Sequence, residues 1–343
     1  MSDTDRTYQP VATAAAWRGP ELQDDKSWLT TASAENIRDI EAALADVRAR
    51  KLAPEAVRRE DFPLPSMVDE LEAIAETIEA GCGFALIRGL PVERWGVDDA
   101  SLAFWGLSLH LGRPVSQNRH GDLMMAVRDT GLAVETVNAR GPLTNSKLHY
   151  HSDFSDIVGL LCINPAREGG TSRICSALAI YNGLVADGRI DLIDALYDGY
   201  LFDRKGEECP DVAPVSEQPI PMLSWHRGIL SFRYTPGWSG TAVKKTGRPW
   251  TPQQQAAVDE VNRLSNDPGF YLDMDFQPGD VQFLNNYAVL HSRTAFVDFP
   301  ELSRKRFLQR IWLRADRGRT LAADFDHLFG AASTRDGIPP VHN

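Results

Sequence analysis

The sequence predicts a mainly β fold with flanking helices, arranged as a β-sandwich or jelly roll. Helical periodicity dominates the first third of the chain, and short strand-like runs broken by Gly, Pro, Asn and Asp follow from about residue 145. One helix interrupts those runs, an order of elements typical of a sandwich covered by helices. No internal repeat or linker divides the 343 residues. We therefore predict a loosely ordered arm over 1–30, a single jelly-roll domain over 31–325 and a C-terminal tail over 326–343.

Three helices are predicted in the N-terminal part of the chain. Ser33 can cap the first helix, whose apolar face follows the helical period. That face consists of Ile37, Ile40, Leu44 and Val47. A second helix is expected to start at Ser66, where Asp69 replaces the glutamate of a capping box, and to end before Gly81. The third helix is expected over residues 98–111.

The predicted strands are apolar or alternating runs bounded by residues that commonly end strands. They cover residues 83–91, 157–163, 171–176, 228–234, 270–276, 281–284 and 306–314. A single helix is predicted between the fourth and the fifth of these runs. It opens with Thr251 as the N-cap and Pro252 at the first helical position, where proline is favoured.

Composition and charge exclude several classes of protein. The net charge of −11 argues against nucleic acid as a partner, because phosphate contacts require a basic surface. No run approaches the ~18 apolar residues of a membrane span, and no signal peptide is visible at the N-terminus. The cysteines lack zinc-type spacing, so we expect reduced thiols at Cys82, Cys162, Cys175 and Cys209. We expect a cytoplasmic protein with a small-molecule substrate. The sequence leaves open whether the protein forms a homo-oligomer.

The sharpest local motif is the triplet His151-Ser152-Asp153. In an extended chain alternate residues point to the same side, so one imidazole and one carboxylate can reach the same metal ion. His291, in NNYAVLHSR, is the best candidate for a third ligand. Two histidines and one carboxylate leave three positions of an octahedral ion open, which is typical of non-haem Fe(II) oxygenases. The alternative makes Asp153 a turn residue and His151 an ordinary polar side chain.

The last predicted strand alternates arginines with apolar residues. Its period of two places one set on a single face: Arg306, Leu308, Arg310, Trp312 and Arg314. If this face lies inside the sandwich, a guanidinium enters the cavity and requires an anionic partner, which a carboxylate provides with a matching two-pronged geometry. The alternative places the arginines in solvent and the opposite face, with Phe307, Ile311 and Leu313, in the core.

Taken together, these motifs resemble the taurine dioxygenase/TfdA-like family of Fe(II)- and 2-oxoglutarate-dependent dioxygenases. The resemblance covers about residues 80–315. It rests on GFALIRGLP, LGRPVSQNRHG, HSDFSD, AREGGTSRICSALAIYN, GILSFRY, PGDVQFLNNYAVLHSRTAFVDF and RKRFLQRIWLR. It implies a double-stranded β-helix, a cupin-like jelly roll. It also implies Fe(II) as the metal, 2-oxoglutarate as the co-substrate and O₂ as the oxidant.

The resemblance also assigns roles to individual residues. His151, Asp153 and His291 match the three iron ligands. Arg306, 15 positions beyond His291, matches the arginine that pairs with the distal carboxylate of 2-oxoglutarate. Ser172 occupies the place of a threonine whose hydroxyl helps to bind that carboxylate, and Thr171 is the alternative if the register slips by one residue. Arg310 matches a second arginine that faces the active site, and the spacing of the strand puts it nearer the iron than Arg306.

The activity implied by the resemblance is hydroxylation of an unactivated C–H bond in a small, anionic or zwitterionic metabolite, with release of succinate and CO₂. The carboxylate of Asp153 favours hydroxylation over halogenation. Desaturation or cyclisation at the same site, a non-catalytic jelly-roll binding protein and a zinc hydrolase are the alternatives. The weaker candidates for substrate contacts are Arg310, Gln117, Asn118, Lys147 and Tyr150.

Overall fold

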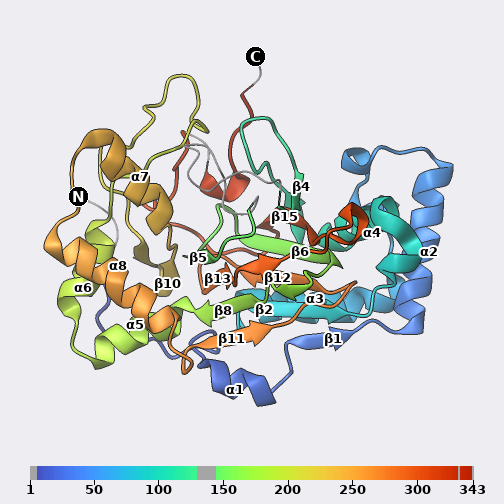
Figure 1. Cartoon of the computed structure of the whole chain (residues 1–343), viewed down its shortest axis with the longest axis horizontal. Helices are drawn as coiled ribbons and strands as arrows, with labels where there is room; N and C mark the ends of the chain where they lie inside the picture. The colour runs from blue at the N-terminus through green and yellow to red at the C-terminus, as the bar shows by residue number, and fades with distance from the viewer. Residues whose placement is uncertain (1–5, 130–143, 331–332, 342–343) are drawn as a thin grey trace.

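The computed structural model describes residues 6–129, 144–330 and 333–341, and two β-sheets lie at its centre (Figure 1). The large sheet has seven strands and the small sheet has four. In spatial order the large sheet contains β1 (Leu29–Thr31), β2 (Phe84–Arg88), β12 (Val281–Asn285), β6 (Ile157–Asn164), β15 (Phe307–Ala315) and β3 (Gly112–Pro114), with β4 (Met124–Val127) also pairing with β15. The small sheet contains β11 (Tyr271–Met274), β8 (Ser172–Ser176), β13 (Val289–Arg293) and β5 (Leu148–His151).

Successive strands cross repeatedly from one sheet to the other. The chain passes from β5 in the small sheet to β6 in the large sheet, returns to the small sheet for β8 and β11, and repeats the crossing through β12, β13 and β15. The pairs that these strands form within each sheet are antiparallel. Two further ladders have two strands each, β9 (Leu223–His226) with β10 (Ile229–Phe232) and β7 (Glu168–Gly169) with β14 (Phe296–Val297). Residues far apart in the sequence therefore meet between the sheets.

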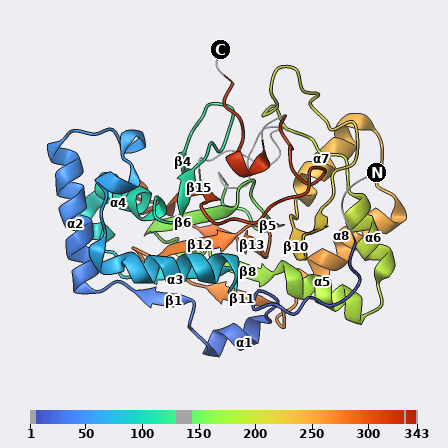
Figure 2. The same ribbon diagram turned by 180° about the vertical axis from the view of Figure 1, so that it is seen from behind.

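Helices flank the sheets on both sides, and the view from behind separates the two groups (Figure 2). One group consists of α2 (Ala34–Ala49), α3 (Val68–Glu79) and α4 (Val92–Ser108). Their apolar residues share one core cluster with side chains of β2, β6, β12 and β15. The other group consists of α5 (Ala177–Ala186), α6 (Ile190–Asp198), α7 (Pro236–Thr246) and α8 (Pro252–Ser265). None of the described helices is both long and apolar enough to cross a membrane.

The expectation of a mainly β protein is wrong, because the fold is mixed. Within the described residues the α-helices contain more residues than the strands. The sequence texture concealed α5, because its apolar residues directly follow the strand β8, and it also concealed the short helix α6. The helices matter for the site because they close the outer faces of the sheets and leave the inner faces to enclose a cavity.

The N-terminal segment is not a loose arm over its described residues. It forms the short helix α1 (Gly19–Asp24) and then β1, which pairs in parallel with β2. Trp17 and Trp28 both contact Phe84 at a ring-centroid distance of 5.5 Å, and the Trp17 indole donates a hydrogen bond to the Cys82 carbonyl. The sequence concealed this packing because its buried residues follow no regular period.

The end of the chain is also packed against the domain. Leu328, Phe329 and Ile338 are buried in the main core cluster. Arg335 donates to both carboxylate oxygens of Asp156, so an ion pair holds this segment close to the strand that follows Asp156. Residues 326–330 and 333–341 are therefore part of the folded body.

Two predicted helix caps are confirmed and one is wrong. Ser33 and Thr251 cap α2 and α8, and each takes part in a reciprocal capping box. Ser66 does not cap α3, because it lies in a 3₁₀ turn over Pro65–Met67 and its oxygens accept hydrogen bonds from Asn36. The third helix starts earlier than expected, at Val92, and bends at Gly96, where φ is 74°.

We predict that Trp17→Ala lowers the free energy of unfolding by about 3–5 kcal/mol, the usual cost of removing a buried tryptophan. Chemical denaturation measures the effect. The control is Val97→Ala in α4, because Val97 is 43% exposed and surface changes usually stay within about 0.5 kcal/mol. Equal stabilities of the two variants would show that the N-terminal segment contributes nothing to the fold.

Candidate functional site

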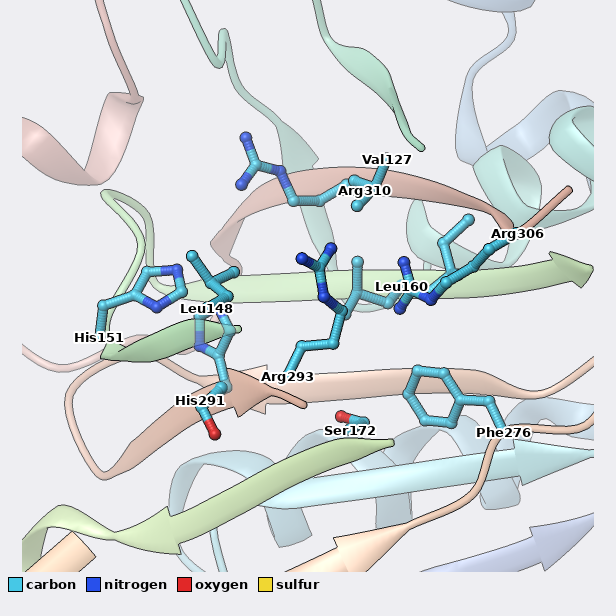
Figure 3. A pocket seen from close by; sticks show the side chains of 12 residues that line it. Val127, Leu148, His151, Leu160, Ser172, Phe276, His291, Arg293, Arg306 and Arg310 are labelled. Atoms are coloured by element: carbon cyan, nitrogen blue, oxygen red, sulfur yellow. The ribbon is translucent and has the colours of Figure 1, made fainter. Parts of the chain in front are cut away.

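A cavity lies between the inner faces of the large and small sheets (Figure 3). Both sheets contribute to its walls, which combine apolar side chains with basic ones. The lining residues are Val127, Leu148, His151, Leu160, Ser172, Phe276, His291, Ser292, Arg293, Arg306, Leu308 and Arg310. A cavity between sheets with few polar groups aimed inward is the usual form of a small-molecule site.

The three predicted metal ligands meet at one end of this cavity. His151 ends β5 and His291 lies opposite it in β13, because the two residues are direct partners in the antiparallel ladder. Their rings are 4.2 Å apart at the centroids, and the Nε2 atom of His291 is 3.8 Å from Oδ2 of Asp153. One ligand atom from each of the three residues lies within 4.8 Å of the others. One ion can therefore contact all three.

The two imidazoles are in the state that metal binding needs. Nδ1 of His151 lies 2.8 Å from the carbonyl oxygen of His149. Because that oxygen only accepts hydrogen bonds, Nδ1 carries the proton and Nε2 keeps a free lone pair. Burial lowers the pKa of both imidazoles, and it lowers that of His291 to about 3. Both rings are therefore neutral at pH 7, as a metal ligand must be.

The carboxylate of Asp153 is held in place from two sides. The indole Nε1–H of Trp312 donates to Oδ2 at 2.9 Å, and Nη1 of Arg310 lies 3.3 Å from both oxygens. Burial alone would raise the pKa of Asp153, but the opposing interactions, led by the charge of Arg310, outweigh burial and lower the pKa. The backbone N–H of Asp153 donates to the side chain of Asn286. The group is therefore an ionised carboxylate in a fixed orientation.

Arg310 faces the inside of the fold, and so does Arg306. Their side chains are 8% and 4% exposed, respectively. The alternative that these arginines face solvent is therefore wrong. Gln117 accepts from Nε of Arg310 and donates to the carbonyl oxygens of Leu123 and Arg310. Gln117 thus holds Arg310 against Asp153, and it is not among the residues that line the cavity. Asn118 closes a turn with Asp122. The expectation that Gln117 and Asn118 form pocket walls is wrong for the described cavity.

Lys147 and Tyr150 flank the metal triplet in sequence but point elsewhere. The Lys147 ammonium donates to Asn266 at the surface, and Tyr150 is buried in the main core cluster. Neither is among the residues that line the cavity. Alternation along β5 accounts for Tyr150, which is adjacent to His151 and therefore points to the opposite face of the strand, whereas Lys147 lies before the strand begins.

Arg306 lies at the opposite end of the cavity from the metal ligands, immediately before β15. Its Nη1 atom is buried without a partner among the described residues. Gly170, at φ 72°, allows its close approach, because a Cβ there would lie 3.1 Å from Nε of Arg306. Ser172 lines the same cavity, whereas the Thr171 hydroxyl donates to Asp275 and faces a neighbouring cavity. Of the two hydroxyls, that of Ser172 shares the cavity with the metal ligands.

The sequence analysis missed Arg293, which also lines the cavity. The signal was present, because Arg293 lies two residues after His291 in a strand and alternate residues share a face. A bulge in the ladder between β13 and β5 lies between these two residues. Irregularities of this kind commonly re-aim side chains next to active sites.

Two neutral imidazoles and one carboxylate beside an open cavity define the site of a mononuclear non-haem iron oxygenase. Comparison with known families gives the same class. The model of the "Taurine catabolism dioxygenase TauD, TfdA family" matches residues 48–312. The chain belongs to this family, and the resemblance noted in its motifs is confirmed.

Two curated relatives extend the comparison. The chain is 30% identical over 315 residues to FR-33289 synthase of Streptomyces rubellomurinus, covering 91% of this chain and 92% of that protein. It is 28% identical over 289 residues to "Taurine hydroxylase-like protein SAT17" of Stachybotrys chartarum, covering 82% of this chain and 74% of that protein. The family match and these relatives make the protein an Fe(II)- and 2-oxoglutarate-dependent oxygenase.

Solved structures share the fold at lower identity. Asparagine oxygenase, in complex with Fe(II), 2S,3S-3-hydroxyasparagine and succinate, matches 83% of this chain and 93% of its own with a TM-score of 0.66 and 18% identity. The non-heme iron oxygenase OrfP, in complex with Fe, succinate and (3S)-hydroxy-L-Arg, matches 83% of this chain and 94% of its own with a TM-score of 0.59 and 17% identity. The arrangement of strands described above is therefore that of known iron oxygenases.

We predict that His291→Ala lowers Fe(II) affinity by at least about tenfold, because losing even an outer partner of a metal site costs 10–100-fold. Anaerobic Fe(II) titration measures the affinity. The matched control is His149→Ala, since His149 is an exposed histidine two residues from His151 and contributes only its backbone carbonyl to the site. Full iron affinity in the His291 variant would remove His291 from the ligand set.

Proposed function

We propose that the protein hydroxylates a C–H bond of a small metabolite that carries an anionic group. In this proposal His151, Asp153 and His291 hold one Fe(II), while Arg306 and Ser172 bind the distal carboxylate of 2-oxoglutarate. The strand order supports a further statement about the fold, namely that the two sheets form a double-stranded β-helix of the cupin-like kind. The observation that carries the functional proposal is a cavity lined by His151, His291 and the buried arginines, with Asp153 directly beside the two histidines.

Bound iron would supply the oxygen activation that no side chain can provide. The residues of the chain hold and orient the reactants. Trp312 and Arg310 fix the carboxylate of Asp153, which with His151 and His291 would hold the ion beside the cavity. Apolar walls from Val127, Leu148 and Leu160 limit the access of water to the reacting centre.

The charge of the cavity supports the binding of anionic ligands, of which 2-oxoglutarate is one. Three guanidinium groups line it, and among the described lining residues no carboxylate balances them. Asp153, just behind that lining, balances Arg310 alone. The complexes of asparagine oxygenase and OrfP contain hydroxylated amino acids, which supports a zwitterionic substrate for this chain. The four cysteines are free, which supports work in a reducing compartment such as the cytoplasm.

The test is substrate-stimulated succinate release. Purified protein with Fe(II), 2-oxoglutarate and O₂ is screened against small acids and amino acids, each beside its neutral amide or ester. We expect stimulation by acids and a product heavier by one oxygen atom, which distinguishes hydroxylation from desaturation. Stimulation by the neutral analogues alone would contradict the proposed substrate class.

We predict that Arg306→Ala raises the dissociation constant of 2-oxoglutarate by roughly a hundredfold or more, since breaking a buried charge pair costs about 3–5 kcal/mol. Calorimetric titration of the metal-loaded protein measures the constant. The matched control is Arg314→Ala on the same strand, because Arg314 forms a half-exposed pair with Asp336, and such surface pairs contribute about 0–1 kcal/mol. An unchanged constant for Arg306→Ala would place the carboxylate elsewhere.

A further inference from the structure

Arg293 is a buried cation that neither the family resemblance nor the proposed function uses. It projects from β13 into the cavity, between the histidines and Arg306 (Figure 3). It is 5% exposed. Nη2 donates to the carbonyl oxygens of Thr144 and Ser146, which fixes the plane of the guanidinium. Nε and Nη1 are buried and lack any partner among the described residues.

Arg293 and Arg306 gather at the same place in the cavity. Their guanidinium carbons lie 4.7 Å and 5.2 Å from the ring centroid of the same residue, Phe296. Arg306 also has a buried Nη1 without a partner. Within the described residues no ion pair joins either guanidinium to a carboxylate, although Asp298 accepts the backbone N–H of Arg306. Two like charges are thus buried side by side with unused donors.

The third arginine of the cavity is in a different situation. Arg310 already has an anionic partner in Asp153 and a second acceptor in Gln117. Arginine side chains stay protonated in proteins, so both Arg293 and Arg306 carry a positive charge. Buried charges need a partner of opposite sign. The need for an anion is therefore confined to the end of the cavity formed by Arg293 and Arg306.

We propose that Arg293 and Arg306 together form one binding site for a single carboxylate, the distal carboxylate of 2-oxoglutarate. This inference rests on the proposed function and adds a second guanidinium to it. A carboxylate offers about four lone-pair positions, enough to accept hydrogen bonds from both guanidinium groups. Arg293 lies two residues from His291, so their Cα atoms are about 7 Å apart along the strand. A co-substrate that chelates the metal beside His291 therefore extends along Arg293 toward Arg306.

The consequence is selectivity for a dicarboxylate over a monocarboxylate. A 2-oxo acid with a methyl group in place of the distal carboxylate would leave both cations buried without an anion. The probe is 2-oxopentanoate, which keeps the chain length and the metal-binding end of 2-oxoglutarate. The alternative ligand of this binding site is an anionic group of the primary substrate. The experiment distinguishes that ligand from 2-oxoglutarate.

The experiment is calorimetric titration of the Mn(II)-loaded protein with each 2-oxo acid in the absence of primary substrate. We expect Arg293→Met to weaken 2-oxoglutarate binding by about 10–100-fold, as for a hydrogen bond to a charged group. Binding of 2-oxopentanoate should not weaken. Because both arginines hold one carboxylate, Arg293→Met combined with Arg306→Met should cost less than the product of the single effects.

The matched control is Arg173→Met, which removes a guanidinium that pairs with Asp273 elsewhere on the small sheet and should leave both affinities unchanged. Arg293→Lys keeps the positive charge but lacks the planar guanidinium, so it should show the same selective loss of 2-oxoglutarate affinity with a smaller fold-change. This variant also tests the inference if Arg293→Met does not fold. Unchanged 2-oxoglutarate affinity, even with weakened substrate binding, overturns the inference, and so does an equal loss for both acids. If the unaltered protein does not prefer 2-oxoglutarate over 2-oxopentanoate, the proposed function itself fails.

Discussion

The register between β13 and β5 is the constraint on which the rest of the site depends. Pairing His291 directly with His151 brings two imidazoles from distant segments within reach of one ion. Side chains alternate along a strand, so a slip by one residue would turn every ligand away from the cavity. The same alternation carries Arg293 into the cavity on the face of His291. Metal ligation and the positive charge of the cavity are thus consequences of one ladder.

The ionised groups at the two ends of the cavity differ in whether they already have a partner. Asp153 and Arg310 neutralise each other, and Trp312 and Gln117 occupy further hydrogen-bonding positions of the pair. At the other end Arg293 and Arg306 keep donors unused. A cavity with a satisfied pair at one end and unsatisfied cations at the other is polar along its length. A molecule that carries a negative charge at a fixed distance from a metal-binding group matches that polarity.

The sequence predicted the chemistry better than the architecture. His151, Asp153, His291 and the inward arginines of β15 follow local rules, namely alternation within a strand and the ligand preferences of a metal. The role of Gln117 could not be predicted, because its contact with Arg310 joins residues 193 positions apart. The packed N-terminal segment was missed for a similar reason. Its tryptophans are buried by tertiary contacts with Phe84, and no local pattern marks them.

The ion pair between Asp156 and Arg335 joins two residues that are synthesised at different times. Asp156 lies three residues beyond the metal ligand Asp153, whereas Arg335 comes 179 residues later. During synthesis the segment that follows the ligand therefore leaves the ribosome long before its partner does. The ladder partner His291 also arrives late. The complete set of iron ligands therefore exists only after His291 has been synthesised, and the ion pair that supports the segment after Asp153 forms later still.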